Sequence, residues 1–340
     1  MLLPTAAAAG AAPLTSAHVT SWREQGFALV DGVLPEALLS RVVADATKMF
    51  PGPGTAGAAA ITNFGGVSFP SETSDAFNEL VLHPRLLAAV GQLLGDPPSE
   101  LRLTQAELWP KYGREKSQDA ARDPNDNEDQ RFHCDYPNHT LTHPPPWDVP
   151  EAVEMILYLC DEAGVGGATA VVPRCGPEDP AYQWPITALP GVGTAVYVND
   201  RAAAEASLPS EVVAFRATHL YAREVRVQYN LGTLLLYRHD TWHRGTPLLP
   251  GALRVVANLT FRKKNSEWIS QLPSGWAWAM YRPTLQMERL IAGASVDARC
   301  LLGFPAPGSP YWTQATILAV AARYGSLGMD ITPYESALAP

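Results

Sequence analysis

Residues 254–261 read Arg-Val-Val-Ala-Asn-Leu-Thr-Phe. Arg254, Asn258 and Thr260 occupy even-numbered positions of this stretch, and every odd-numbered position is apolar. Because successive side chains of a strand point to opposite faces of a sheet, the alternation predicts a strand with one polar and one apolar face. If the polar face looks into a barrel, the Arg254 guanidinium needs an anionic partner there, and the neighbouring sequence offers no obvious acidic residue for that role.

Seven other short apolar or alternating runs precede this strand and are separated by Gly, Pro, Asn and Asp. They lie at residues 101–105, 153–160, 168–172, 194–198, 211–215, 225–229 and 233–237. Short runs with turn residues between them predict antiparallel strands in a β-sandwich or barrel, and they argue against a doubly wound sheet. The expected fold class is therefore mainly β.

Helical signals gather before residue 100, where capping residues, prolines and the 3.6-residue period coincide. Helices are expected from Ser16 to Gly26, after Pro35 and from Pro84 to Gly95, with a strand at Phe27–Val30. We expect a disordered lead-in over residues 1–13, helices and a strand packed on the barrel over 14–100, the catalytic β core over 101–265, and a helical or loop extension over 266–340. Residues 115–130 are polar and aperiodic, which is typical of a long loop that covers a site.

Composition excludes several classes of function. With 46% apolar and 17% charged residues, the chain has an ordinary globular composition. Its net charge of −9 makes nucleic acid an improbable partner. The four cysteines include no CxxC pair, so neither a zinc ribbon nor a thioredoxin-like site is expected. The chain shows no secretory signal and no membrane-spanning stretch, so we expect a cytoplasmic protein without a membrane partner.

The histidines are the strongest indication of chemistry. His133 and Asp135 are two residues apart, and in a strand they would project from one face. A histidine nitrogen and a carboxylate oxygen side by side are two of the three ligands in a facial triad that holds iron(II) and leaves coordination positions open. We choose His243 as the third ligand, since it follows an apolar run in the string Thr-Trp-His-Arg-Gly. His239 competes, but its place at a predicted turn favours a solvated role, or one outside the ligand set.

Longer stretches of the chain resemble the phytanoyl-CoA dioxygenase-like family of iron(II) and 2-oxoglutarate oxygenases. The family pattern is an HxD pair, a distant His and an Arg eleven residues after it, which His133, Asp135, His243 and Arg254 match. The resemblance also covers residues 22–27, 31–35, 82–84, 93–95 and 166–173. The chain departs from the family at residues 174–176, where Arg-Cys-Gly replaces the usual Gly-Ser-His.

The resemblance implies a double-stranded β-helix, a cupin-like jelly roll with flanking helices. It also implies that His133, Asp135 and His243 hold Fe(II) and that Arg254 pairs with the distal carboxylate of 2-oxoglutarate. Gln105 and Lys111 stand where related members place further contacts to this cosubstrate. The implied reaction uses O2, hydroxylates a small-molecule substrate and releases succinate and CO2. Halogenases of the family replace the carboxylate ligand by a small residue, so Asp135 favours hydroxylation.

Two other interpretations stay open. One is a cupin-type metal enzyme that works without 2-oxoglutarate, and the other is a catalytically silent β-barrel that binds a ligand. Succinate release from 2-oxoglutarate would distinguish the first, and iron-dependent oxygen uptake would distinguish the second. The sequence leaves the assembly as a monomer or a homodimer.

Overall fold

The computed structural model describes residues 12–61, 66–113, 129–134, 146–183, 200–206, 208–266 and 286–338. Strands β1 to β9 span Phe27–Val30, Val67–Ser68, Leu101–Tyr112, Ala152–Tyr158, Thr169–Val171, Val225–Arg226, Leu234–Tyr237, His243–Gly245 and Leu253–Lys263. Helices α1 to α5 span Ser16–Gln25, Glu36–Met49, Ala56–Ala60, Asp75–Val81 and Pro84–Leu94. Helices α6 to α8 span Pro180–Gln183, Arg201–Glu205 and Ser210–His219, and helices α10 to α13 span Gln286–Gly293, Val296–Leu301, Gln314–Tyr324 and Thr332–Glu335.

The N-terminal elements begin and end where local signals place them. The Thr15 side chain accepts a hydrogen bond from the His18 backbone N–H at the start of α1, and Gly26 ends the helix with φ of 95°. Gly95 ends α5 in the same left-handed conformation. These caps confirm the expected helices, and the strand at Phe27–Val30 is confirmed as β1.

The strands form two antiparallel sheets. The major sheet has the order β1-β7-β4-β9-β3-β2, and the minor sheet has the order β6-β5-β8. Among the described residues no strand is hydrogen-bonded into both sheets, so the sheets pack face to face without closing a barrel. Strand β9 lies between β3 and β4 in the major sheet, which makes its two faces the two faces of the sheet.

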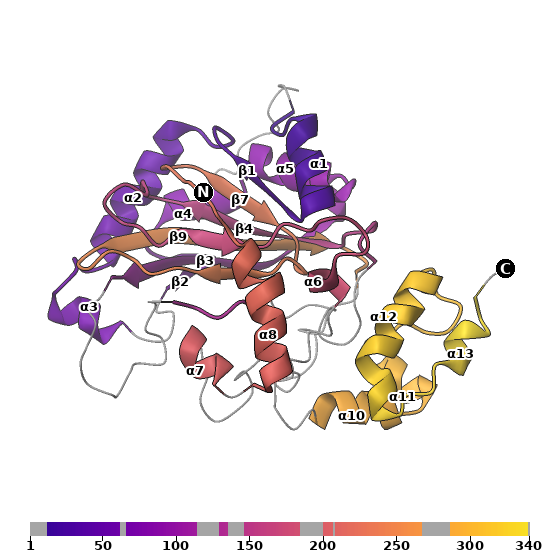
Figure 1. The fold of residues 1–340 in the computed structure, drawn as a ribbon. Coiled ribbons are helices and arrows are strands. Elements are labelled where there is room, and N and C mark those ends of the chain that lie inside the picture. Colours follow the sequence, from indigo (N-terminus) through magenta and orange to yellow (C-terminus); the bar gives the residue numbers. More distant parts are fainter. Residues whose placement is uncertain are drawn as a thin grey trace.

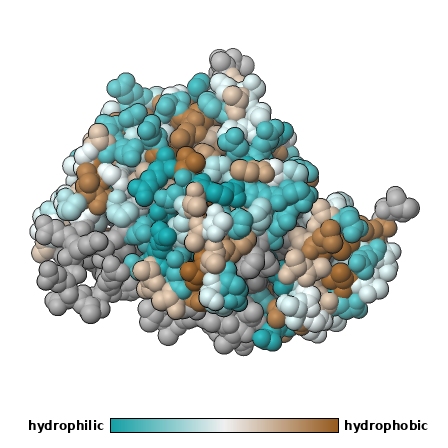
Figure 2. Space-filling model, in the orientation of Figure 1, coloured by the Kyte–Doolittle hydropathy of each residue, from teal (hydrophilic) through white to brown (hydrophobic). Residues whose placement is uncertain are grey.

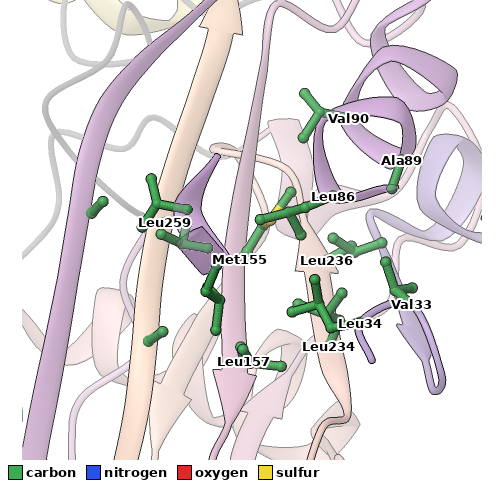
Figure 3. Close-up of a cluster of buried hydrophobic side chains, with 14 of the residues drawn as sticks. Val33, Leu34, Leu86, Ala89, Val90, Met155, Leu157, Leu234, Leu236 and Leu259 are labelled. Atoms are coloured by element: carbon green, nitrogen blue, oxygen red, sulfur yellow. The ribbon is translucent and has the colours of Figure 1, made fainter. Parts of the chain in front are cut away.

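The apolar face of the major sheet packs against the N-terminal helices (Figure 1). Figure 3 shows Leu86, Ala89 and Val90 of α5 opposite apolar side chains of β4, β7 and β9. Met155 and Leu259 belong to this cluster and are 1% exposed. Burying such side chains contributes about 1.5–3 kcal/mol each, so this layer fixes which face of the sheet looks outward.

The opposite face of the major sheet looks toward the minor sheet. Val256 of β9 and Tyr158 of β4 are register partners, and both belong to a buried cluster that includes Val171 of β5. Arg254, Asn258 and Thr260 share the parity of Val256 and therefore face this interior. The structure thus meets the condition that the sequence analysis set, namely that the polar face of this strand looks inward.

The outer face of the minor sheet belongs to a third cluster. This cluster combines Phe132, Ala170 and Trp242 with side chains from α10 and α12, such as Ile291 and Val320. The C-terminal helices thus pack against β5 and against the residues next to His133 and His243. Figure 2 shows hydrophobic residues also on the visible surface of these helices.

One expected strand is wrong. Residues 211–215 lie in helix α8, which follows Pro209 and has Glu211 in its first turn. Its buried residues, Val212 and Arg216, are four apart, which is the spacing of one helix face. The run at 194–198 lies outside the described residues, as do residues 115–128 of the expected loop. Every helix in the described ranges is too short or too polar to cross a lipid bilayer.

Candidate functional site

Two histidines that are 110 positions apart lie side by side between the sheets. His133 and His243 are paired in antiparallel register, with His133 N donating to His243 O at 3.0 Å and His243 N donating to His133 O at 2.9 Å. Their ring centroids are 4.4 Å apart. Since directly opposite residues of an antiparallel pair project to the same face, both side chains share one environment. His243 is 5% exposed and His133 is half-buried.

The hydrogen bonds of the two rings select a tautomer. His133 Nδ1 lies 3.1 Å from Arg131 O, and His243 Nδ1 lies 3.0 Å from Thr241 O. A carbonyl oxygen can only accept, so each Nδ1 carries the proton and donates it. In a neutral ring the coordinating lone pair is then on Nε2. A backbone carbonyl that orients a ring through its other nitrogen is the usual arrangement around metal-binding histidines.

The two chain neighbours of His133 face away from the His243 ring. Phe132 and Cys134 are buried in the outer cluster with Trp242, whereas His133 pairs with His243. Cys134 thus faces away from the two histidines. Asp135, the carboxylate candidate, lies outside the described residues. The described residues alone contain no cluster of three or more metal-ligating side chains.

His239, the competing histidine, has a different environment. Its Nδ1 lies 2.5 Å from Glu154 Oε1, and both side chains are buried. The other carboxylate oxygen of Glu154 accepts a hydrogen bond from Thr260. Solvation, one of the two roles expected for His239, is therefore wrong, because its side chain is 5% exposed. The pairing was not foreseen, since it depends on the alignment of β4 with β7, where Glu154 lies opposite Tyr237.

Arg254 lies at the start of β9 and is 3% exposed. Its Nη1 donates to Gly167 O, while its Nε makes no hydrogen bond to the described residues. None of the ion pairs in the described ranges involves Arg254, so its charge has no carboxylate partner there. Gly167 has φ of +68°, and a Cβ at this position would meet the Leu248 side chain at 2.7 Å. The glycine thus permits the close approach of this loop to the strand end.

The other two candidate residues lie on β3 and are not brought together. Lys111 is the register partner of Arg254, and burial together with that neighbouring cation holds the pKa of Lys111 well below its usual range. Gln105 lies six residues earlier, about 20 Å along the strand. Its amide contacts Glu107 and Thr260. Lys111 and Arg254 therefore form one cationic group, and Gln105 belongs to the polar group around Glu154.

The same part of the molecule contains tyrosines that sequence reasoning missed. Tyr237 lies next to His243, with 4.7 Å between ring centroids. Tyr158 stacks on Tyr229 at 3.9 Å and donates a hydrogen bond to Thr169 at 2.7 Å, which joins the two sheets. The inward parity of Tyr158 and Tyr237 on their strands was the available signal.

Two antiparallel sheets with polar and histidine side chains between them place the protein in the double-stranded β-helix, or jelly-roll, fold class. Within this class, the family model of phytanoyl-CoA dioxygenase (PhyH) matches residues 22–255. The chain belongs to the phytanoyl-CoA dioxygenase family, and it is thus an oxygenase that depends on Fe(II), 2-oxoglutarate and O2.

Several solved structures are similar to this chain. EvdO2 from Micromonospora carbonacea var. aurantiaca is 13% identical over 74% of this chain and 91% of its own, with a TM-score of 0.51. EctD from S. alaskensis is 16% identical over 83% and 87% of the two chains, with a TM-score of 0.48. SnoN, an epimerase from nogalamycin biosynthesis, is 18% identical over 73% and 81%, with a TM-score of 0.44. A comparison with curated proteins found no match.

Proposed function

We propose that the protein hydroxylates a small-molecule substrate with Fe(II), 2-oxoglutarate and O2, and releases succinate and CO2. The observation that carries this proposal is the pairing of His133 with His243, in which both rings donate through Nδ1 to a backbone carbonyl. Together with Asp135, they would supply two imidazole nitrogens and one carboxylate to the metal. This donor set suits iron(II) and leaves positions open for the cosubstrate and dioxygen.

Arg254 and Lys111 would bind the distal carboxylate of 2-oxoglutarate. Arg254 is 3% exposed, and a buried guanidinium without a carboxylate partner is unfavourable because burial penalises its charge. A carboxylate of the cosubstrate would offset that cost, and the Arg254 Nε–H remains available to donate to it. Gln105 fits this role less well, because it lies about 20 Å from Lys111 along β3.

Bound iron supplies the oxidative chemistry, and the residues of the chain supply its placement. The backbone carbonyls of Arg131 and Thr241 fix the ring orientation of the two histidines. Arg254 fixes the far end of the cosubstrate, so the keto acid can reach the metal in one orientation only. The tyrosine stack of Tyr158 and Tyr229 fills the interior beside Arg254 and excludes water from the ion pair formed there.

Hydroxylation is proposed over halogenation because Asp135 occupies the carboxylate position. Anaerobic titration of the protein with Fe(II) and 2-oxoglutarate tests the site directly. We expect a weak visible charge-transfer band of the chelate, which His243→Ala abolishes. Succinate formed from 2-oxoglutarate would then exclude a metal enzyme that works without the keto acid. A protein that shows neither the band nor iron-dependent oxygen uptake would be a silent binding protein instead.

A further inference from the structure

A buried arginine lies next to one proposed iron ligand, on the opposite face of the same strand. Arg244 follows His243 in β8, is 2% exposed and pairs with Ala170, whose side chain belongs to the outer cluster. Its Nε and Nη2 donate to the Glu224 carboxylate at 2.8 and 3.0 Å, and its Nη1 donates to Asp129. One guanidinium therefore binds carboxylates from two different segments.

The segment that begins with Asp129 also carries His133. Gln130 N donates to Gly245 O at 3.1 Å, and Gly245 N donates to Gln130 Oε1 at 2.8 Å. These bonds, the Arg244–Asp129 ion pair and the pairing of His133 with His243 join the segment to β8 along its whole described length. Asp129 is also held from the other side, because the backbone N–H of Arg201 donates to its carbonyl at 2.8 Å.

The second carboxylate has a different position in the fold. Glu224 immediately precedes β6, which pairs with β5 and carries no proposed ligand. Burial raises the pKa of Glu224, but the hydrogen bonds and charge of Arg244 outweigh that effect and lower it below its usual value. Glu224 thus stabilises Arg244 without linking the two ligand-bearing segments. Both carboxylates bind Arg244, but only Asp129 belongs to the segment that carries His133.

We propose that the Arg244–Asp129 ion pair is a positioning device for the proposed iron site, on which this inference rests. The pair holds the 129–134 segment against β8 before metal binds, so the His133 and His243 rings need no rearrangement to share one cation. The Arg244 side chain is 2% exposed and the Asp129 side chain 36%, and charge-assisted hydrogen bonds are roughly twice as strong as those between neutral groups. Mutation of residues that orient metal ligands without binding the metal typically lowers metal affinity by about 10- to 100-fold.

The test compares Asp129→Asn with Glu224→Gln in the full-length apo protein, with cobalt(II) as the probe. Each variant removes one negative charge from the same arginine, and each keeps the shape of its side chain. We expect Asp129→Asn to weaken cobalt(II) binding by about tenfold and to change the visible cobalt spectrum. Glu224→Gln should lower the melting temperature yet leave cobalt affinity within about twofold of the wild type. Asp129→Glu should restore part of the affinity.

Three outcomes would count against the ideas separately. If Asp129→Asn melts at lower temperature but binds cobalt(II) as the wild type does, the ion pair is only structural and the inference is overturned. Equal loss of cobalt affinity in both carboxamide variants overturns it as well. If His243→Ala binds cobalt(II) like the wild type, the proposed iron site itself is wrong. Should Asp129→Asn fail to fold, Arg244→Lys, which keeps the charge but loses the fork, should show an intermediate loss of affinity.

Discussion

The hydrogen bond that one ring nitrogen makes determines what the other nitrogen of a histidine can do. In His133 and His243 the Nδ1 atoms donate to carbonyls two residues earlier, so both rings have the same tautomer. Arg254 offers a hydrogen-bond donor and not a metal ligand: it donates to a backbone carbonyl and retains an N–H without a hydrogen bond to the described residues. Substitution of the histidines should therefore affect metal binding, whereas substitution of Arg254 should affect 2-oxoglutarate binding.

We predict that His133→Ala, Asp135→Ala and His243→Ala each abolish iron(II) binding. Arg254→Ala should retain iron but weaken 2-oxoglutarate binding by about 30-fold or more, as expected when a charge pair that contributes about 2 kcal/mol or more is lost. Anaerobic titrations, first with iron(II) and then with 2-oxoglutarate, measure the two affinities in turn. Retained iron affinity in any of the three ligand variants would contradict the ligand assignment.

His239→Ala should retain the metal and much of the activity. Because the His239 ring lies beside the buried Glu154 carboxylate, its loss should lower the free energy of unfolding by about 1–3 kcal/mol. Urea unfolding measures the stability, and iron titration measures the affinity. His219→Ala in α8, where the half-buried ring contacts Phe215, serves as the control and should leave the iron affinity unchanged. Loss of iron in His239→Ala would mean that His239, and not His243, is the third ligand.

At the level of elements, the sequence predicts what is decided locally. The caps at Thr15, Gly26 and Gly95 place the helices, and the alternation in 254–261 places β9 and its inward face. Residues 211–215 were misread because a short apolar run fits either a strand or a helix, and Pro209 with Glu211 decides for the helix. The Glu154–His239 pair was out of reach, since it depends on the register between strands far apart in the chain.

The loop before β5 gives the element-scale prediction. Gly167→Ala would place a Cβ 2.7 Å from Leu248 and 3.4 Å from Arg254 Nη1, at a φ of +68°. We expect 2-oxoglutarate affinity to fall about tenfold, equivalent to about 1.4 kcal/mol, because the Gly167 carbonyl orients Arg254. Gly164→Ala is the matched control: its φ is +85°, but its Cβ would meet nothing within 4 Å. It should lose about 1 kcal/mol of stability and no cosubstrate affinity. Equal affinity losses in both variants would refute the argument.

On the scale of the whole molecule, the C-terminal helices support the strands that carry the candidate ligands. Ile291 of α10 shares a cluster with Phe132 and Trp242, which are the chain neighbours of His133 and His243. In α10, Glu288 is fully buried, and burial raises its pKa to about 7, although the Arg323 cation of α12 partly opposes the shift. The stability of this layer should therefore depend on pH.

Between about pH 4.5 and 7 the unfolded chain ionises Glu288 while the folded protein keeps it protonated, so this group stabilises the fold progressively less as pH rises. Glu288→Gln removes the dependence. The free energy of unfolding of the variant should match that of the wild type below about pH 4.5 and exceed it by up to about 3 kcal/mol above pH 7. The loss of the attraction between Arg323 and the Glu288 carboxylate reduces this gain. Urea unfolding across this pH range measures the difference. A difference between Glu288→Gln and the wild type that does not vary with pH would show that the Glu288 carboxyl is already ionised in the folded protein.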